Sequence, residues 1–127
     1  MVQQKLQIKT TGIDHVVLWV SDLARSKHFY MELLGMTVAH ESDWQAFLHC
    51  GNQQVALFDA SKRGMRVQSG ALQHMALLME PASYEETKSR VEEEGCSVEG
   101  RNGDPWCIYF DDPDGHRIQL LYKGHDD

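Results

Sequence analysis

The chain is poor in features that mark several large classes of protein. Its 127 residues contain three cysteines, an odd number without Cys-x-x-Cys spacing, so a disulfide framework is not expected. No apolar run approaches the roughly 20 residues that a membrane-spanning helix needs. The N-terminal segment MVQQKLQIKTTG lacks the apolar centre of a secretory signal. We therefore expect a protein with reduced thiols that stays in the cytoplasm.

Basic charge is also scarce. Twelve Lys and Arg residues stand against nineteen Asp and Glu residues, and the formal net charge is −7 at pH 7. A surface of this sign repels phosphate backbones and anionic lipid headgroups. We expect neither nucleic acid nor a membrane among the partners.

The sequence does contain a repeat. GIDHVVLWV at residues 12–20 and ALQHMALLM at residues 71–79 are both strand-like, and each has a lone histidine in fourth position, His15 and His74. A helical stretch, a glycine and further strand-like segments follow each copy. Because 127 residues are too few for two independent cores, the copies are expected to share one core and to supply one histidine each to a common site.

The two halves show a similar order of predicted elements. In the first half, a strand at 12–20 precedes a helix that Ser21 and Asp22 can cap and that Gly35 can end. In the second half, Ser83 and Glu86 have capping-box spacing at the start of a helix. A linker is expected at about residues 60–70. The remaining predicted strands lie at 36–40, 44–50, 54–58, 71–79, 96–99, 106–110 and 116–122, which makes each half βαβββ.

Alternation along the first strand separates two faces. Neighbouring side chains on a strand point to opposite sides of the sheet. If His15 faces a cavity, Trp19 faces it too, whereas Val16, Leu18 and Val20 suit packing against a helix.

The second half divides in the same way. With His74 on the cavity side, Met75 and Leu77 lie behind it. In the last strand Ile118 belongs to a helix-packing face, so Gln119 points to the other side. Two histidines and one glutamine are therefore expected on the concave side.

These segments resemble a known superfamily. The histidine-bearing strands, the helix SDL…FYMELLGM and YFDDPDGHRIQLL are similar to the vicinal oxygen chelate superfamily, which includes glyoxalase I, extradiol dioxygenases, fosfomycin-resistance transferases and bleomycin-binding proteins. The resemblance covers residues 12–122 as a single domain. It implies an α+β fold in which two βαβββ modules, at about 12–59 and 71–122, form a curved mixed β-sheet cup.

The resemblance also implies a divalent metal, Zn, Ni, Co, Mn or Fe, held by His15, His74 and Gln119. The usual residue at the last position is glutamate. An amide oxygen still coordinates, but it is uncharged and cannot act as a general base. A further ligand position of glyoxalase-type members falls on Ala56, which cannot bind metal. Relatives commonly form homodimers, sometimes with exchanged modules, so that one cup takes His15 from one subunit and His74 with Gln119 from the other.

Strand parity also nominates the walls of the cavity. If the halves align, the substrate-binding residues are Trp19, Phe47, His49 and Tyr109, with Arg117 as a cation for an anionic end of a small organic ligand. The three aromatic residues are equally compatible with an ordinary core role. No catalytic group is assigned, and His49 is a candidate general base only by elimination.

Two functions stay open. The first is a metal-dependent enzyme whose cation chelates oxygens of a small substrate, in glyoxalase-like lyase or isomerase chemistry or in dioxygenase-type chemistry. Gln119 and Ala56 count against glyoxalase I itself, and Val17 counts against fosfomycin transfer because the resemblance expects threonine there. The alternative is a metal-free protein that sequesters a small molecule, as bleomycin-resistance proteins do; a dimerisation or regulatory domain is a third reading. The remaining histidines are expected to be solvated: His28, His40, His116 and His125.

Overall fold

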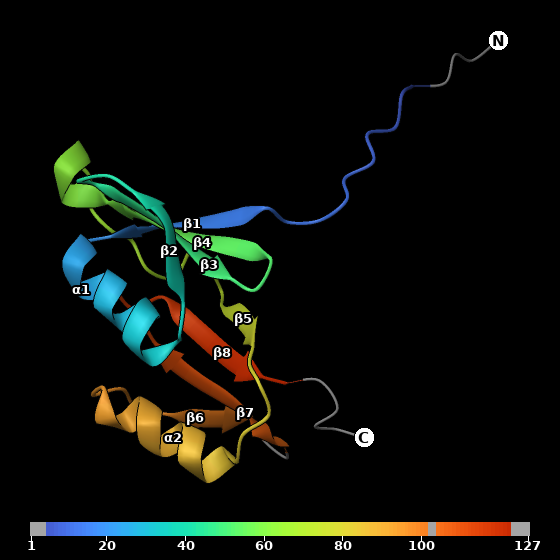
Figure 1. Cartoon of the computed structure of the whole chain (residues 1–127), viewed down its shortest axis with the longest axis vertical. Helices are drawn as coiled ribbons and strands as arrows, with labels where there is room; N and C mark the ends of the chain where they lie inside the picture. Colours follow the sequence, from blue (N-terminus) through green and yellow to red (C-terminus); the bar gives the residue numbers. More distant parts are fainter. Residues whose placement is uncertain (1–4, 102–103, 123–127) are drawn as a thin grey trace.

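The computed structural model describes residues 5–101 and 104–122, and the βαβββ order occurs twice along it (Figure 1). We refer to these two units as the first and second modules. Within the described ranges, no helix has the length and apolar character required to cross a bilayer. The elements of the first module are β1 His15–Val20, α1 Leu23–His28, β2 Thr37–Glu41, β3 Gln45–Cys50 and β4 Gln53–Asp59.

The second module repeats the same order with a longer helix. Its first strand is shorter than the predicted 71–79, because it begins one residue after His74. The elements are β5 Met75–Leu78, α2 Tyr84–Glu93, β6 Glu99–Arg101, β7 Asp104–Asp111 and β8 Arg117–Leu121.

The helices begin at the residues that the sequence favours. The Asp22 side chain accepts a hydrogen bond from the backbone N–H of Arg25 at 3.1 Å, and the Ser83 hydroxyl accepts one from the backbone N–H of Glu86 at 3.1 Å. After α1 the chain widens into a π-helical turn, η1 Phe29–Leu33, and Gly35 leaves it with a φ of 72°. The sequence did not predict this turn.

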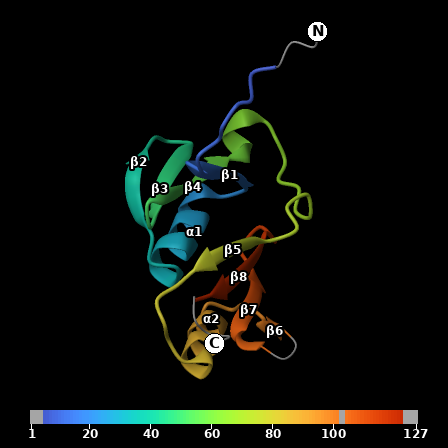
Figure 2. The same ribbon diagram turned by 90° about the vertical axis from the view of Figure 1, so that its right-hand side faces the viewer.

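Each module forms one mixed four-stranded sheet. The strand orders are β1-β4-β3-β2 and β5-β8-β7-β6, with β1 parallel to β4, β5 parallel to β8, and the other neighbours antiparallel. Figure 2 shows β5 beside β8 in the second sheet. The predicted linker between the sheets contains a short 3₁₀ turn, η2 Ala60–Arg63. Both histidine-bearing segments therefore lead into edge strands.

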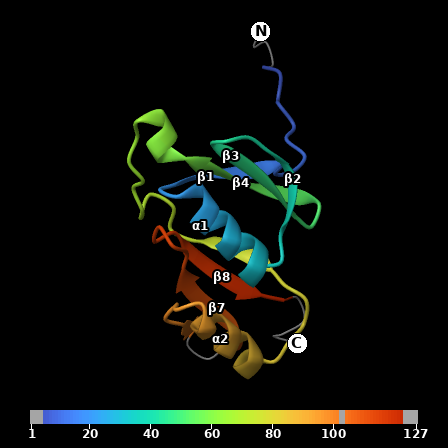
Figure 3. The ribbon, with the colours of Figure 1, turned by 60° about the vertical axis from the view of Figure 1, so that its left-hand side comes forward.

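Along the long axis the first sheet is followed by α1 and then by the second module, in which α2 lies beside its sheet (Figures 1 and 3). Leu18 and Val20 are buried on the side of the first sheet that α1 covers, as predicted. Phe29 then lies 6.2 Å, between ring centroids, from Phe110 of the second sheet. Ile118 is fully buried in the same core. One apolar core thus runs through both modules, with α1 inside it.

A set of polar contacts, which we call the module junction, joins the residues at the two ends of α1 to the turn between β7 and β8. The Tyr30 hydroxyl donates to Asp112 at 2.7 Å, and Asp114 accepts from the Ser21 hydroxyl at 2.6 Å and from its backbone N–H at 3.2 Å. Burial, reinforced by these two carboxylates, raises the pKa of Tyr30 far above its usual value, so its hydroxyl stays a donor.

His116 also belongs to the module junction. Its Nε2 lies 2.8 Å from the backbone carbonyl of Trp19, and the residue is 6% exposed. The expectation that His116 is solvated is therefore wrong, because its contact comes from a strand almost a hundred residues away in sequence. His28 and His40 are exposed, and His125 lies outside the described residues.

Candidate metal and substrate site

His15 opens β1 on the side of the first sheet that faces away from α1. Its Nδ1 lies 2.8 Å from a carboxylate oxygen of Asp14, and its ring meets the edge of Phe47 at 5.5 Å between centroids. Because an ionised carboxylate only accepts, the contact assigns the proton to Nδ1. The lone pair of Nε2 is then available for a metal ion.

His74 repeats this arrangement on the second sheet. Its Nδ1 is hydrogen-bonded to the side-chain oxygen of Gln73, and its ring lies 5.7 Å from Tyr109. An amide oxygen is also an acceptor, so the same tautomer follows. The repeat thus extends from the two histidines to the partners that orient them.

Gln119 lies in β8, the strand that pairs with β5. It is opposite Ala76 on one side and Tyr109 on the other, and it is 2% exposed. Its Nε2 is buried and has no hydrogen-bond partner in the part of the chain that the structure describes. An unsatisfied buried polar group costs about 1–3 kcal/mol. A ligand that offers this nitrogen a hydrogen-bond acceptor would remove that cost.

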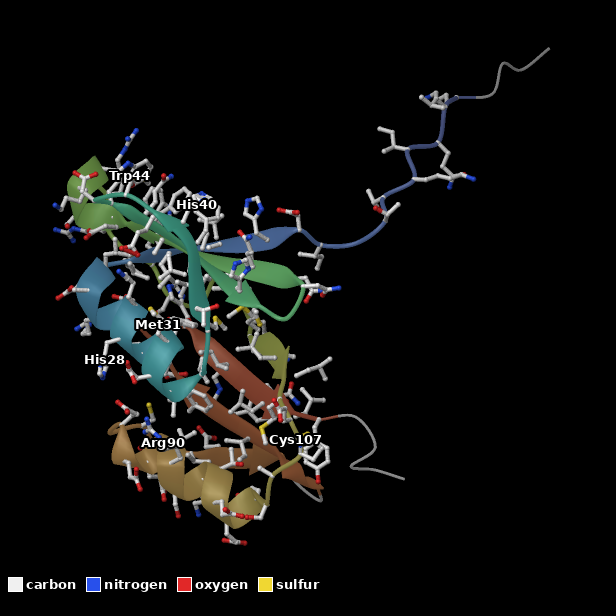
Figure 4. The ribbon with its side chains drawn as sticks, viewed as in Figure 1. His28, Met31, His40, Trp44, Arg90 and Cys107 are labelled. Carbon is white, nitrogen blue, oxygen red and sulfur yellow. The ribbon has the colours of Figure 1, made fainter. Side chains whose placement is uncertain are left out.

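Partly exposed rings cover the open side of the first sheet, and we call them the aromatic face. The Phe58 ring lies 6.0 Å from Trp19, 5.1 Å from Trp44 and 5.8 Å from Phe47. His40 stacks on Phe47 at 4.4 Å, with 15° between the rings. Figure 4 shows His40 and Trp44 on the side of the sheet away from α1. The aromatic face can bind a planar or apolar group.

Sequence reasoning missed two members of the aromatic face. Phe58 could have been found, because it has the strand parity of Ala56, two residues earlier. His40 could not, because β2 carries an irregularity between Val38 and His40 that shifts its register against β3.

The open side of the second sheet combines one ring with one cation. The Arg117 guanidinium lies 5.4 Å from the centre of the Tyr109 ring, and it also pairs with Glu99 at 3.1 Å and with Asp111 at 3.4 Å. Gln73, His74, Tyr109 and Arg117 line a hollow of about 290 Å³. The two carboxylates together carry more charge than the cation, so the group of three is net negative and its attraction for an anionic substrate is weak.

The predicted site residues divide into two groups, one on each sheet. Since α1 covers the inner side of the first sheet, the two open sides do not face each other within one chain (Figure 3). Two hollows of about 500 and 520 Å³ elsewhere in the molecule include neither His15 nor His74 in their linings. The first-sheet group is His15, Trp19, Phe47 and His49. The second-sheet group is His74, Tyr109, Arg117 and Gln119.

No three His, Cys, Asp or Glu side chains of residues 5–101 and 104–122 gather as a metal cluster. This absence agrees with the placement of His15 and His74 on different sheets. It also agrees with the predicted ligand set, because Gln119 is an amide and is not one of these four residue types. Ala56 lies between Val17 and Phe47 in the register of the first sheet, on the side that carries His15. Ala56 thus presents only a methyl group on this face, and a methyl group cannot bind a metal.

Comparison with known proteins assigns the chain to a family. The model of the Glyoxalase/Bleomycin resistance protein/Dioxygenase superfamily matches residues 12–120. The chain belongs to this superfamily. The membership and the double βαβββ fold predicted from the sequence are thereby confirmed.

Two curated relatives in the superfamily are transferases. Glutathione transferase FosA of Serratia marcescens is 33% identical over 111 residues, which are 86% of this chain and 79% of that protein. Metallothiol transferase FosB of Staphylococcus saprophyticus is 32% identical over 113 residues, which are 86% and 75% of the two chains. The structure of an integron cassette protein from the mobile metagenome of V. cholerae matches with a TM-score of 0.73 at 25% identity, covering 94% of this chain and 100% of that one.

Proposed function

We propose that the chain is a metal-dependent enzyme acting on a small organic substrate, with a site completed between two subunits. The observation that carries the proposal is the matched orientation of His15 and His74. Each imidazole has its Nδ1 bonded to the preceding side chain and lies on an open sheet face, and within residues 5–101 and 104–122 neither Nε2 has a hydrogen-bond partner.

The donor types fit a divalent cation. Two imidazole nitrogens and the amide oxygen of Gln119 suit Zn, Ni, Co, Mn or Fe(II). The buried Nε2 of Gln119, which has no partner among the described residues, would then remain as an N–H donor for a substrate oxygen. The FosB relatives, named metallothiol transferases, support the same reading. When bound, such a cation polarises substrate oxygens as a Lewis acid.

The arrangement of the modules supports an exchanged homodimer. The module junction holds α1 between the sheets, so the open faces point outward in one chain. Val17 on one open face and Leu78 on the other are 42% and 61% exposed. In the part of the chain that the structure describes, the edge strands β1 and β5 are also without a neighbouring strand on one side. Pairing the first sheet of one subunit with the second sheet of its partner would cover both apolar positions and both strand edges.

The side chains of the two faces then have distinct tasks. Trp19 and Phe47 would pack against the substrate from one subunit, and Tyr109 from the other. Arg117, already paired with two carboxylates, would orient a polar end of the substrate rather than supply a full positive charge. Neither Gln119 nor Ala56 can remove a proton, which leaves exposed His49 as the candidate general base.

A metal-free binding protein is the alternative that the aromatic face favours. Its rings would hold an aromatic or cationic compound by stacking, without turnover. The Arg63 guanidinium lies 4.5 Å from the centre of the Trp44 ring, which shows that a ring of the aromatic face can accept a cation.

Metal analysis of single variants and of their mixture tests the proposal. Wild type should hold about one ion per chain, and His15→Ala and His74→Ala should each lose it. Unfolding and refolding the two variants together should restore about a quarter of the wild-type content, because mixed dimers contain one complete site. His28→Ala, which replaces an exposed histidine at the end of α1, is the matched control and should retain metal.

The outcomes separate the competing readings. An empty mixture, with metal present in wild type, would show that the two histidines act within one chain. Wild-type protein that stays empty after incubation with each of the five metals, but whose tryptophan fluorescence responds to aromatic compounds, would favour the binding protein instead.

A further inference from the structure

We propose that Asp14 is a positioning residue that returns to the metal site the negative charge that Gln119 does not provide. The inference rests on the metal site proposed above. It concerns how this chain holds a cation with three neutral ligands.

The geometry places Asp14 one hydrogen bond behind the ligand. Its carboxylate oxygen lies 2.8 Å from Nδ1 of His15, on the ring atom opposite the one that would meet the metal. A carboxylate in this place fixes the tautomer and orientation of the ring, and it raises the basicity of the ligating nitrogen. A part of the missing charge therefore reaches the cation through the imidazole.

The second module has a neutral amide, not a carboxylate, bonded to its histidine. Gln73 occupies the equivalent position and bonds Nδ1 of His74 in the same way, but it is neutral. It can orient the ring without adding charge. The pair Asp14 and Gln73 thus separates orientation from electrostatics within a single molecule.

The charges of the complete set support the assignment. The usual superfamily set of two imidazoles and one glutamate carries −1. Here the set His15, His74 and Gln119 carries none, and Asp14 brings the total back to −1. Glu99 and Asp111 pair with Arg117 on the second sheet and leave that group of three with a net charge of −1, but within the described residues neither carboxylate is hydrogen-bonded to the His74 ring as Asp14 is to His15.

Cobalt titration followed by visible absorbance tests the role. Asp14→Asn keeps an oxygen acceptor but removes the charge, and it should weaken Co²⁺ binding about tenfold. Loss of such a partner usually weakens metal affinity about 10- to 100-fold. We expect the smaller loss because the Asp14 side chain is 92% exposed in the single chain, where water screens its charge. Asp43→Asn, at an exposed carboxylate outside the site, should leave the affinity unchanged.

Rescue by relocated charge gives a second measurement. Adding Gln119→Glu to Asp14→Asn should restore binding to the wild-type affinity or above it, because the carboxylate then contacts the metal directly. Gln73→Glu should also strengthen binding, by placing a second carboxylate behind His74.

Nitrogen NMR of the metal-free protein gives a measurement independent of metal. In its neutral form, wild-type His15 should carry its proton on Nδ1. Asp14→Ala should shift that ring toward the other tautomer and leave His74 unchanged. Equal Co²⁺ affinity in wild type and Asp14→Asn would overturn this inference alone. A wild type that binds no metal would overturn the proposed function, and the role of Asp14 with it.

Discussion

The Tyr30 hydroxyl donates a 2.7 Å hydrogen bond to the Asp112 carboxylate, and this buried contact links the helix of the first module to the turn of the second. The two residues are 82 positions apart in sequence. The same carboxyl group accepts the backbone N–H groups of Asp114 and His116. This contact therefore helps to keep α1 between the sheets, and with it the outward direction of both open faces.

Replacing Tyr30 should weaken the whole fold. Tyr30→Phe removes the hydroxyl and leaves a buried carboxylate short of one donor, so we expect a loss of about 1–3 kcal/mol in the free energy of unfolding, measured in urea. Tyr84→Phe, which removes a hydroxyl from the partly buried start of α2, is the control. Equal stability of the two variants would contradict this account of the module junction.

Removing the Asp114 side chain should loosen the start of α1. Asp114→Ala deletes the acceptor for the Ser21 hydroxyl and backbone N–H and for the Ser26 hydroxyl. A loss of about 1–3 kcal/mol is expected, because these donors lose their partner. Hydrogen exchange should show faster opening of α1 in this variant, whereas Asp43→Ala should match wild type.

Charged substitutions on the open faces should break the proposed dimer. Val17→Lys and Leu78→Lys each place an ammonium group where the partner sheet is expected, and each should raise the dimer dissociation constant at least about tenfold. Sedimentation equilibrium over a range of concentrations measures this constant. Met65→Lys is the control, because Met65 is 49% exposed but lies in the segment that connects the sheets. Unchanged association of all three variants would place the dimer contact elsewhere.

Acid should remove the stabilising effect of Asp59. Burial acts to raise the pKa of its carboxyl group, but hydrogen bonds from the Ser61 side chain and from the backbone N–H groups of Leu23, Ser61 and Lys62 outweigh it and lower the pKa. A lowered pKa means that the ionised form favours the fold. The contribution should be complete above the unfolded pKa of about 4 and should disappear as the pH falls through the folded value.

Comparison of Asp59→Asn with wild type measures this contribution. The difference in free energy of unfolding between the two proteins should be present at neutral pH and smaller at about pH 3. Ser61→Ala should reduce the wild-type advantage at neutral pH, because it removes the strongest of the hydrogen bonds that lower the pKa. A difference that does not vary with pH would contradict the assignment.

The sequence alone predicted the features that depend on neighbouring residues. The repeat around His15 and His74 gave the two βαβββ units, and alternation along the strands correctly separated the buried Leu18 and Ile118 from the open faces. The helix starts at Asp22 and Ser83 were also predicted. All of these depend on spacing within a few residues, where strand and helix periodicity act directly.

The tertiary structure decided what depends on distant segments. The burial of His116 against the Trp19 carbonyl and the stacking of His40 on Phe47 follow from packing and from an irregular strand register. The placement of α1 between the sheets also depends on packing between distant segments. It turns the two halves of the predicted site away from each other in one chain. No local pattern encodes these results, because they arise from contacts between segments that meet only when both modules pack around one core.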